Sequence, residues 1–434
     1  MIRLCATGDS ILLDPIPAEY EKVSAPLIDF IRQADVRIAN METTLTDFDC
    51  YASTFCGGTW LSASPLVLND LDRFGFQYYS FANNHSMDYA SGGVESTLKA
   101  LKDHGAAFSG SGMDLASATR HAAVRTPKGS FGFIAVTATC DDSGRAGNPH
   151  GPIPGRPGVN MLRHKEIFSV NAEHMEALKQ IAAETKINGR QDNSKKGGYT
   201  LDTPGIFNLG TLNFRLAEEE GKFTIPNPAD SERNLAAIRK ACGDVDHVVV
   251  CLHSHEIPGL TDDEPDYFVK TFAHDCIEAG ASAVICSGTH QIKAVELWQS
   301  RPIFYSIANF IFQSDHVAFL PADFYEKYSV PREFSVEEAI AVRSDHGRRG
   351  LQTDFSNYMG LVPMLTFDDD GNLVDLVIQP TELCFSESRA LKGLPRKADP
   401  ETFERIFSRL CQLSDPYGTV FTAEDGLISV RLEQ

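Results

Sequence analysis

Five short polar stretches, each placed where an apolar run stops, contain most of the side chains in this sequence that could do chemistry. They are Thr7-Gly8-Asp9-Ser10, Ala39-Asn40-Met41-Glu42, Ala82-Asn83-Asn84-His85, Leu252-His253-Ser254-His255-Glu256 and Ser287-Gly288-Thr289-His290. Asp, Glu, Asn and His side chains are ligands for divalent ions such as Mn²⁺, Fe²⁺ or Zn²⁺. A site that takes single ligands from many strand ends keeps coordination positions open for substrate. Together, the stretches predict a metal site.

The elements that must position these stretches follow an alternating strand and helix pattern. Up to about residue 140, β-rich runs at 2–6, 36–39, 78–81 and 131–137 alternate with helix-like stretches at 25–32, 66–74 and 94–104. The pattern resumes with a helix at 235–242, a strand at 247–252, a helix at 266–279 and strands at 283–286, 294–298 and 303–307. Repeated βα units imply a mainly parallel sheet that is covered by helices on both faces.

Two stretches interrupt this pattern. Residues 141 to about 232 contain a loop rich in Gly and Pro, an amphipathic helix at 172–187 and a polar segment at 188–200 that we expect to be mobile. We interpret them as an insertion, because the βα pattern resumes afterwards. The second irregular stretch, 313–357, is followed by a predicted hairpin at 361–367 and 373–378, a helix at 400–413 and a short final strand.

The overall composition restricts the kinds of partner. The chain has 434 residues and a formal net charge of -20, which argues against non-specific binding to nucleic acid or to an anionic membrane. An anionic substrate must therefore be captured locally, by metal or by a few arginines. The N-terminal residues read as a strand, not a signal peptide, and the ten cysteines include no C-x-x-C pair. We expect a cytoplasmic protein without a disulfide framework or a membrane span.

The candidate site residues all lie just past the predicted carboxyl ends of strands, the edge where open α/β sheets bind ligands. Asn84 offers a neutral oxygen ligand beside His85, which can donate a proton to a leaving group. His253 and His255 alternate along a strand end, so they should point to opposite faces if the backbone stays extended. Only one of them should then enter the site, and we favour His253.

The order and residue identities of these stretches resemble those of the CapA family. This family is named for capsule and poly-γ-glutamate synthesis proteins and has a calcineurin-like metallophosphatase fold. The resembling stretches are Gly8-Asp9, Asn40-Met41-Glu42, Ala82-Asn83-Asn84-His85-Ser86-Met87-Asp88, the strand into His253, Gly288-Thr289-His290, and residues 302–312. The sequence similarity continues at 155–160, 360–362 and 413–419, so the resemblance covers most of the chain.

The resemblance implies an α/β fold, a four-layer α/β/β/α metallophosphatase-like sandwich with inserted loops and a C-terminal extension. Residues 1–312 would form the CapA-type domain, with the insertion at about 141–232. Residues 313–434 would complete the sandwich. The segments 141–232 and 313–357 would form the walls of the pocket.

The resemblance also implies roles for individual residues. Asp9, Glu42, Asn84, His253 and His290 would be metal ligands, with Glu42 between two metal positions, and His85 would be the proton donor beside Asn84. The chain departs from the family pattern at Cys286-Ser287, where a Gly-His pair is usual, and at Ile11, where general metallophosphatases place a His. A hydroxyl is a poor substitute for imidazole. One metal position would therefore be weakened unless His255 supplies a ligand.

Three functions are compatible with this resemblance. The first is a hydrolase-like enzyme that uses one or two divalent ions, Mn²⁺ before Fe²⁺ or Zn²⁺, on a peptide or glutamyl-polymer amide. The second is a metal-dependent peptide epimerase acting on a lasso-type precursor. The third is a non-catalytic capsule component that handles polymer. The net negative charge of the chain argues against this function, because it would repel a polyanion. The sequence leaves the oligomeric state open.

Overall fold

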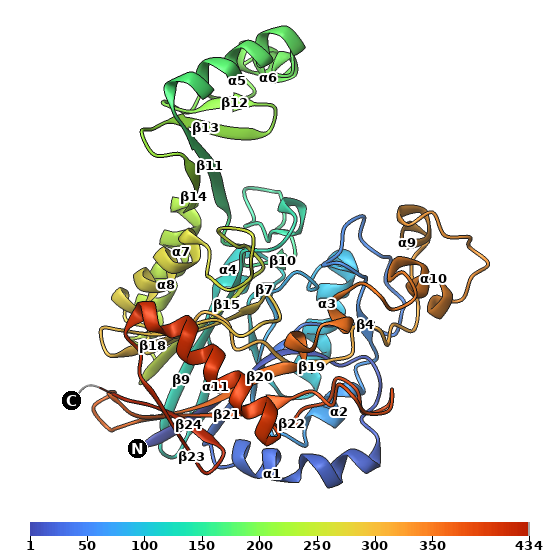
Figure 1. Cartoon of the computed structure of the whole chain (residues 1–434), viewed down its shortest axis with the longest axis vertical. Helices are drawn as coiled ribbons and strands as arrows, with labels where there is room; N and C mark the ends of the chain where they lie inside the picture. The colour runs from blue at the N-terminus through green and yellow to red at the C-terminus, as the bar shows by residue number, and fades with distance from the viewer. Residues whose placement is uncertain (433–434) are drawn as a thin grey trace.

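The computed structural model describes residues 1–432 and is built around two large β-sheets (Figure 1). Within these residues the first sheet has ten strands: β23 (Phe421–Glu424), β24 (Leu427–Val430), β21 (Leu373–Glu382), β20 (Met359–Phe367), β1 (Ile2–Ile11), β2 (Val36–Met41), β5 (Tyr78–Ser80), β6 (Ala107–Ser109), β19 (Asn309–Phe312) and β22 (Arg396–Lys397). The second has six: β17 (Val295–Trp298), β18 (Arg301–Phe304), β16 (Ala283–Gly288), β15 (His247–Ser254), β9 (Gly129–Thr137) and β8 (Ala122–Thr126).

The two sheets pack face to face through side chains that alternate along each strand. Leu4 of β1 lies between the sheets in one apolar cluster with Val249 of β15, and Tyr78 stacks on Phe133 with ring centroids 4.3 Å apart. The next residue along β1, Cys5, belongs to the cluster on the opposite face. This two-residue period buries both faces of each sheet.

Helices cover the two outer faces. The first sheet packs against α1 (Glu21–Ile31), α2 (Val67–Leu71) and α3 (Ala90–Asp103). The second packs against α7 (Pro228–Ala241) and α8 (Tyr267–Glu278), and α11 (Pro400–Ser414) contacts β17, β20 and β21. The four-layer α/β/β/α sandwich that the resemblance implied is thereby confirmed.

The strands after residue 358 extend the first sheet. β20 pairs antiparallel with β1, and β21 pairs antiparallel with β20 in the predicted hairpin. The first sheet is therefore mixed, parallel from β1 to β6 and antiparallel on the other side. In the second sheet β15 is parallel to both β9 and β16, so their carboxyl ends lie at one edge.

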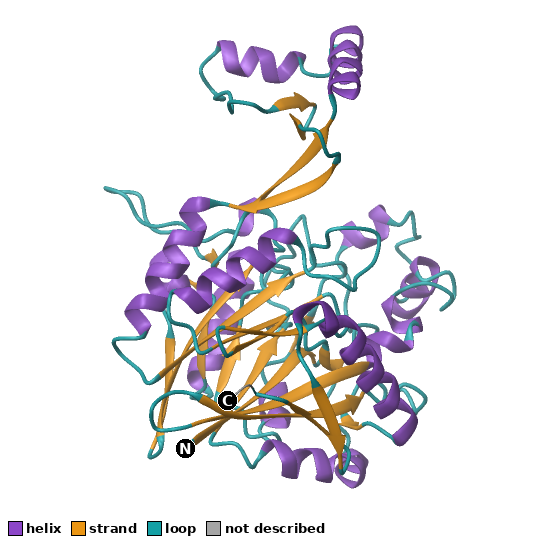
Figure 2. Ribbon diagram, turned by 60° about the vertical axis from the view of Figure 1, so that its left-hand side comes forward, coloured by secondary structure: helices purple, strands orange, loops and turns teal. Residues whose placement is uncertain are grey.

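Residues 164–226 form a separate four-stranded sheet with two helices, which projects from the sandwich (Figures 1 and 2). Its elements are β12 (Phe207–Leu209), β13 (Leu212–Leu216), β11 (His164–Val170), β14 (Gly221–Pro226), α5 (Ala172–Thr185) and α6 (Gly189–Lys196). The polar segment 188–200, which we expected to be mobile, contains helix α6. Its residues form no amphipathic pattern, which is the signal that would have revealed it.

The stretch 313–357 also contains helices that we did not expect. They are α9 (Ala322–Lys327) and α10 (Val336–Arg343), and Ser335 forms a capping box with Glu338 at the start of α10. Such short helices are fixed by caps and tertiary contacts more than by periodicity. The other short elements are α4 (Leu115–Thr119), β3 (Thr44–Leu45), β4 (Ser62–Ala63), β7 (Ser111–Gly112), β10 (Gly158–Val159), and the 3-10 helices at Ala18–Tyr20, Asp142–Gly144, Leu351–Thr353, Phe355–Tyr358 and Asp415–Tyr417.

Among residues 1–432, no helix has both the length and the apolar character needed to cross a membrane.

Candidate metal centre

The polar strand ends of the two sheets meet at one edge of the sandwich. Asp9 lies in β1 where the pairing with both neighbouring strands becomes irregular, and Glu42 directly follows β2. From the second sheet, His253 lies near the end of β15 opposite Ser287 of β16. Residues from both sheets therefore face one another across the interface, in the arrangement expected for ligands at the carboxyl ends of parallel strands.

Two glycines allow the backbones to approach closely at this edge. A Cβ on Gly8 would lie 1.8 Å from the carbonyl oxygen of Ala308, and a Cβ on Gly288 would lie 2.6 Å from that of Ser254. Gly288 also has a φ of 120°, and its N–H donates to Oδ2 of Asp9 at 3.0 Å. Only glycine satisfies these positions, so they help fix the site geometry.

Two groups of side chains are close enough to share a metal ion. One group contains Asp9, Glu42 and His253, and the other contains Glu42, His255 and His290; within each group the ligand atoms lie within 4.8 Å of one another. Glu42 belongs to both. This is the arrangement that a carboxylate between two metal positions would require, and carboxylate with imidazole suits Mn²⁺, Fe²⁺ or Zn²⁺.

Glu42 provides the strongest indication that a cation belongs here. The residue is fully buried, and neither of its carboxylate oxygens accepts a hydrogen bond from any residue in 1–432. Burial raises the pKa of Glu42 well above its usual value, and the negative charges of Asp9 and Asp88 raise it further. Nε2 of His253 lies 3.6 Å from Oε1 of Glu42, beyond hydrogen-bond distance. A buried carboxylate without hydrogen bonds is costly unless a cation neutralises it. The residues present therefore fit a bound divalent ion.

Asp9 is in a different electrostatic situation. Its Oδ1 accepts a hydrogen bond from Asn40 Nδ2 at 2.7 Å, and its Oδ1 and Oδ2 lie 3.7 and 3.8 Å from Nδ1 of His253 and His290. Burial alone would raise the pKa of Asp9, but the nearby imidazoles of His253 and His290 hold it below its usual value. Asp9 is therefore an anion that is ready to bind a cation.

Asn84 and His85 are oriented by separate partners. Asn84 Nδ2 donates to the carbonyl of Gly57 at 2.9 Å, which turns its Oδ1 toward His253 Nε2 at 2.8 Å. His85 Nδ1 lies 2.7 Å from Oδ2 of the fully buried Asp88. With Nδ1–H donating to that carboxylate, Nε2 of His85 is the ring nitrogen that stays free to accept or donate a proton.

Asp88 is itself held in place, because it accepts backbone N–H groups from Gly57 at 3.0 Å and from Leu61 at 2.8 Å. Burial raises the pKa of Asp88, whereas the charge of His85 and these hydrogen bonds oppose the rise. The carboxylate fixes both the orientation and the tautomer of His85.

His253 and His255 both reach the site, so the expectation that only one would do so is wrong. The two Nε2 atoms lie 3.1 Å apart, and the rings are 5.1 Å apart between centroids. The reason is that β15 ends at Ser254, after which the strand alternation no longer applies. Burial lowers the pKa of His255 well below its usual value, and the charges of His253 and His290 lower it further. His255 therefore stays neutral and able to bind metal.

His290 lies in the turn after β16 with a φ of 60°, a conformation that is unusual for a residue other than glycine. Its Nδ1 lies 2.8 Å from Oδ1 of Asn309, whose Nδ2 donates to the carbonyl of Asn357. Burial lowers the pKa of His290. Backbone strain at a fixed, neutral imidazole is consistent with a functional position.

The two positions that depart from the family pattern have distinct environments. Ser287 Oγ lies 3.1 Å from Nδ1 of His253, on the Asp9 side of the site. Ile11 is buried in the apolar cluster on the outer face of the first sheet. His255, which we considered as a compensating ligand, belongs to the other group, with Glu42 and His290.

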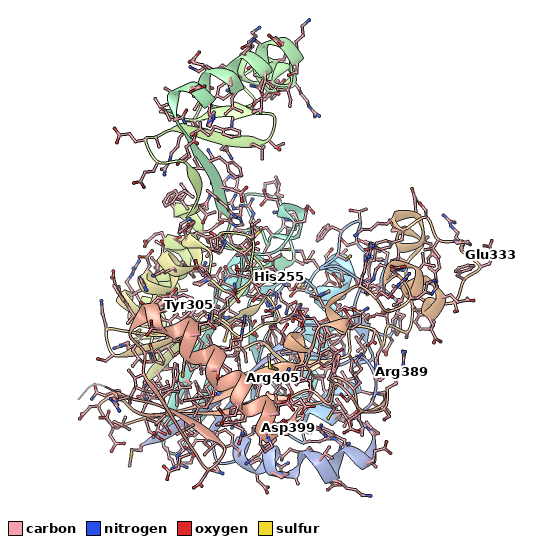
Figure 3. The ribbon with its side chains drawn as sticks, in the orientation of Figure 1. His255, Tyr305, Glu333, Arg389, Asp399 and Arg405 are labelled. Atoms are coloured by element: carbon pink, nitrogen blue, oxygen red, sulfur yellow. The ribbon has the colours of Figure 1, made fainter. Side chains whose placement is uncertain are left out.

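A cavity of about 670 Å³ opens beside the site, and Asn84, His255 and Glu256 lie in its lining. Figure 3 labels His255 near the middle of the molecule, below the projecting segment. The rest of the lining comes from residues 55–57 and 138–142 and from Met161, Arg163 and His164. The start of the insertion therefore contributes to the wall, as expected.

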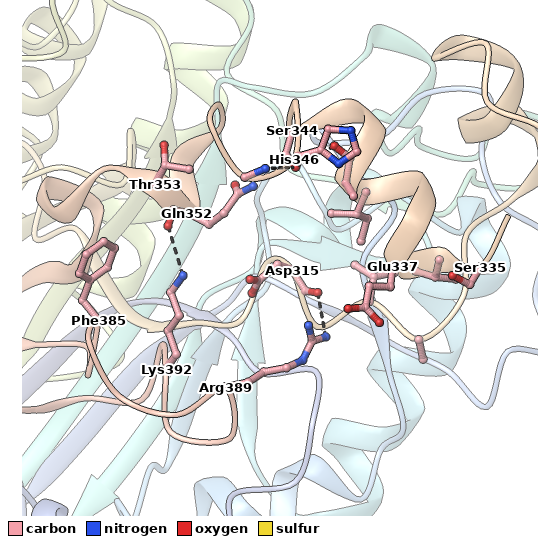
Figure 4. Close-up of a pocket in the computed structure, with 16 residues that line it drawn as sticks. Asp315, Ser335, Glu337, Ser344, His346, Gln352, Thr353, Phe385, Arg389 and Lys392 are labelled. Atoms are coloured by element: carbon pink, nitrogen blue, oxygen red, sulfur yellow. Dashed lines mark hydrogen bonds between the residues drawn. The ribbon is translucent and has the colours of Figure 1, made fainter.

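The segment 313–357 does not line this cavity, contrary to our expectation. It forms a different pocket of about 850 Å³ together with the loop that carries Arg389 and Lys392 (Figure 4). In that pocket Arg389 donates to the carbonyl of Asp315, and Lys392 donates to that of Gln352. The segment 313–357 instead contacts the loop at 48–60. Phe319, which precedes α9, packs on Phe48, and Arg343 of α10 donates to Thr59.

Sequence reasoning assigned no role to several residues that position the site. Asn40, Asp88, Asn309 and Thr139 contact Asp9, His85, His290 and the backbone N–H of His255, respectively. The three-residue spacing from His85 to Asp88 was a usable signal. Asn309 and Thr139 become neighbours of the site only through the tertiary fold.

Comparison with known proteins identifies the family of the chain. Residues 3–314 match the family described as bacterial capsule synthesis protein PGA_cap. Two uncharacterized proteins of Sinorhizobium fredii (strain NBRC 101917 / NGR234), y4sH and y4uA, are each 28% identical over 439 residues, covering 99% of this chain and 93% of theirs. A solved 5'-nucleotidase precursor from Thermus thermophilus is 11% identical with a TM-score of 0.35, over 95% of this chain. This chain spans 58% of that structure's length.

The family match covers well over half of the chain, from the first strand to just beyond β19, and contains every residue of the candidate metal centre. The chain belongs to the bacterial capsule synthesis protein PGA_cap family.

Proposed function

We propose that the chain is a divalent-metal-dependent enzyme that cleaves an amide bond in a peptide or a glutamyl polymer. The observation that carries the proposal is the buried carboxylate of Glu42, which has no hydrogen-bond partner within 1–432 and is shared by two groups of ligand atoms beside a cavity. A carboxylate in this state needs a cation, and the adjoining space gives a substrate access to it.

The donor set indicates which residues would hold the metal. Asp9, Glu42 and His253 would hold one ion, and Glu42, His255 and His290 would hold a second, with the amide oxygen of Asn84 available beside His253. A bound divalent ion would polarise the substrate carbonyl and lower the pKa of water. Mn²⁺ is our first choice among the ions that accept mixed oxygen and nitrogen ligands.

His85 would supply the proton that the leaving amine requires. Asp88 accepts from Nδ1 and stabilises the protonated ring, so Nε2 would donate the proton and then recover it from solvent. Asn84 holds its amide oxygen toward the site because Gly57 fixes its Nδ2. These two adjacent residues would orient the scissile group and protonate it.

The charges around the cavity favour a peptide over a polyglutamate chain. Asp141, Asp142 and Glu256 lie in the lining, and Arg163 is already paired with Asp230 through two hydrogen bonds of 2.7 and 3.1 Å. A run of free carboxylates would be repelled by these acids. The segment of substrate in this cavity is therefore neutral or cationic.

The test is a substrate panel given to protein loaded with Mn²⁺, Fe²⁺ or Zn²⁺ and followed by mass spectrometry in D₂O. The panel contains α-linked peptides, γ-linked glutamyl peptides and a phosphoester. The proposal expects a peptide to be cleaved into two fragments whose masses sum to that of the peptide plus one water, with the reaction abolished in Glu42→Gln protein. Cleavage of the phosphoester alone would overturn it, as would amide cleavage that persists unchanged in Glu42→Gln.

A peptide epimerase is the second candidate, and Glu256 is the observation that favours it. Its carboxylate lies in the cavity wall and accepts from Thr139 Oγ1 at 2.8 Å and from Ser254 Oγ at 2.6 Å, with no cation on it within the described chain. An epimerase needs one group to remove an α-proton and another to return it, and Glu256 and His85 would be that pair. In the same D₂O experiment, epimerisation would add one deuterium without cleavage.

A third candidate, a protein that handles capsule polymer without catalysis, gives a separate outcome. It would bind γ-linked glutamyl chains and leave the mass of every peptide unchanged.

A further inference from the structure

We propose that the groove between α4 and α7 is an exosite, a binding site outside the metal centre, for a carboxylate-rich segment of a peptide. The groove has a volume of about 610 Å³. Its lining includes the cationic or ionisable side chains of Arg120, His121, Arg233 and Lys240, but only one carboxylate, Asp114. In a chain whose net charge is -20, this excess of positive charge in one groove is exceptional.

Two of these cations have no partner. Neither Arg120 nor Lys240 forms a side-chain hydrogen bond or an ion pair with any residue in 1–432, and both are exposed. The one carboxylate in the lining is occupied, because Oδ1 of Asp114 accepts from both the N–H and the hydroxyl of Ser117 at 2.7 Å. The free charges in the groove are therefore positive.

The environment of His121 indicates that several positive charges lie close together at this groove. Burial lowers the pKa of His121, and the charges of Lys240, Arg120 and Arg125 lower it further against the opposing charge of Asp244. Asp244 lies 3.8 Å from His121 Nε2, and its backbone carbonyl accepts from Arg125. The carboxylate of Asp244 is thus directed at His121, and it forms no ion pair with Arg120 or Lys240.

The groove combines these cations with an apolar floor, formed by Leu115, Ala116, Ala236 and Ala237. A compact phosphate would use only the charges, and the five-residue helix α4 is already capped by Asp114. A peptide that alternates acidic and apolar side chains would use both the floor and the rim. The pocket of Figure 4, where Asp315 and Glu337 face Arg389 and Lys392, lacks this imbalance of charge.

The groove and the cavity beside the metal centre share one wall. Arg233, in the groove, donates to the carbonyl of Met161 at 2.7 Å, and Met161 lies in the lining of the cavity. An acidic segment held in the groove would therefore lie next to the cavity whose own acids reject it. This inference goes beyond the proposed chemistry, because binding at the groove is measurable whether or not the metal centre cleaves amides.

The experiment measures fluorescence anisotropy of a labelled peptide of alternating glutamate and leucine, titrated with full-length protein. The Arg120→Ala/Lys240→Ala double variant should weaken binding about tenfold or more, because two unpaired charges are lost. The control, Lys22→Ala/Lys102→Ala, makes the same change in net charge with two exposed lysines of α1 and α3, and should change binding less than about twofold.

Three further ligands distinguish the possible sources of binding. A peptide with glutamine in place of glutamate should bind wild-type protein weakly. Its affinity should be no higher than that of the glutamate peptide for the Arg120→Ala/Lys240→Ala variant. Competition by γ-linked oligoglutamate would identify a polymer as one source of the carboxylates, and its failure would leave α-linked peptides. Equal loss in both double variants, equal binding of the glutamine peptide, or stronger competition by a single-stranded oligonucleotide would each overturn the proposal.

Discussion

The candidate metal centre and the projecting segment 164–226 are built in different ways. At the centre Asp9 and Glu42 are fully buried, and the grouped ligand atoms come from strand ends of both sheets. In the projecting segment no residue of α6 is buried, and Tyr199 and Leu201 are 89% and 87% exposed. One region is fixed by the whole fold and the other by local contacts.

This difference teaches where substitutions should matter. Each group at the centre depends on others, since Asn40 contacts Asp9 and His253 while Glu42 serves both sets of ligands. Removing the hydrogen-bond partner of a buried charge, such as Asn40 beside Asp9, leaves that charge unpaired, which is costly. The projecting segment has little buried surface of its own, so changes there should leave the centre intact.

The largest effect should come from Glu42→Gln. Glutamine keeps the shape but removes the anion shared by both groups, so bound metal should fall more than about 100-fold in affinity at both positions. The metal-free variant should melt no lower than wild type, because a buried unpaired carboxylate has gone. Metal analysis and thermal melting test this, with the exposed Glu333→Gln as control (Figure 3). Stoichiometric metal in Glu42→Gln would contradict the assignment.

The next effect concerns His85→Ala, which should separate proton transfer from metal binding. Turnover should fall about 100-fold or more, while metal content stays within error of wild type. The exposed His150→Ala serves as control. If metal is lost together with activity, His85 is a ligand and not the proton donor.

The centre was largely predictable because the fold family and the strand ends both pointed to it. Asp9, Glu42, His253 and His290 lie where apolar runs stop, and parallel strands bring such ends together. The placement of His255 was not predictable from alternation, because nothing in Leu252-His253-Ser254-His255 marks Ser254 as the last strand residue. The hydrogen bonds of Asn309 and Thr139 arise from pairings of distant strands.

The sandwich was predictable for a related reason. Its strands and long helices have strong periodicity, and each buries a face against another layer. The helix α6 and the short helices α9 and α10 lack that periodicity and depend on caps and neighbouring loops. The parts that sequence patterns missed are the parts with the least core.

A comparison of His253→Ala with His255→Ala tests whether the centre has two metal positions. His253 belongs to the group with Asp9 and His255 to the group with His290, so each variant should lose one position and keep the other. The loss should be larger for His253→Ala, whose ring also contacts Asn84 and Ser287. Isothermal titration with Mn²⁺ measures both sites. Unchanged metal binding in His255→Ala would show that only His253 of this pair binds metal, as strand alternation predicts.

A smaller effect should follow from Ser287→Ala. For Nε2 of His253 to bind metal, Nδ1 must carry the proton, and Ser287 Oγ at 3.1 Å can accept it whereas the nearby Asn40 Nδ2 can only donate. Loss of the hydroxyl should weaken the Asp9 position about tenfold, the lower end for a residue that orients a ligand. Ser287→Thr keeps the hydroxyl and should bind like wild type. Equal weakening in both variants would assign the effect to packing.

The smallest effect on the metal centre should come from deleting most of the projecting segment. Ser169 and Gly221 are opposite one another in the antiparallel pair of β11 and β14, so residues 170–220 can be replaced by an Asn-Gly turn that closes the hairpin. The shortened protein should keep its metal, and its melting temperature should change by less than about 5 °C, because the removed surface is mostly local. Turnover of a short amide should persist, while a long peptide that touches the projecting segment should lose affinity. A fall in metal content would show that this segment supports the centre, and the contrast between the two regions would no longer hold.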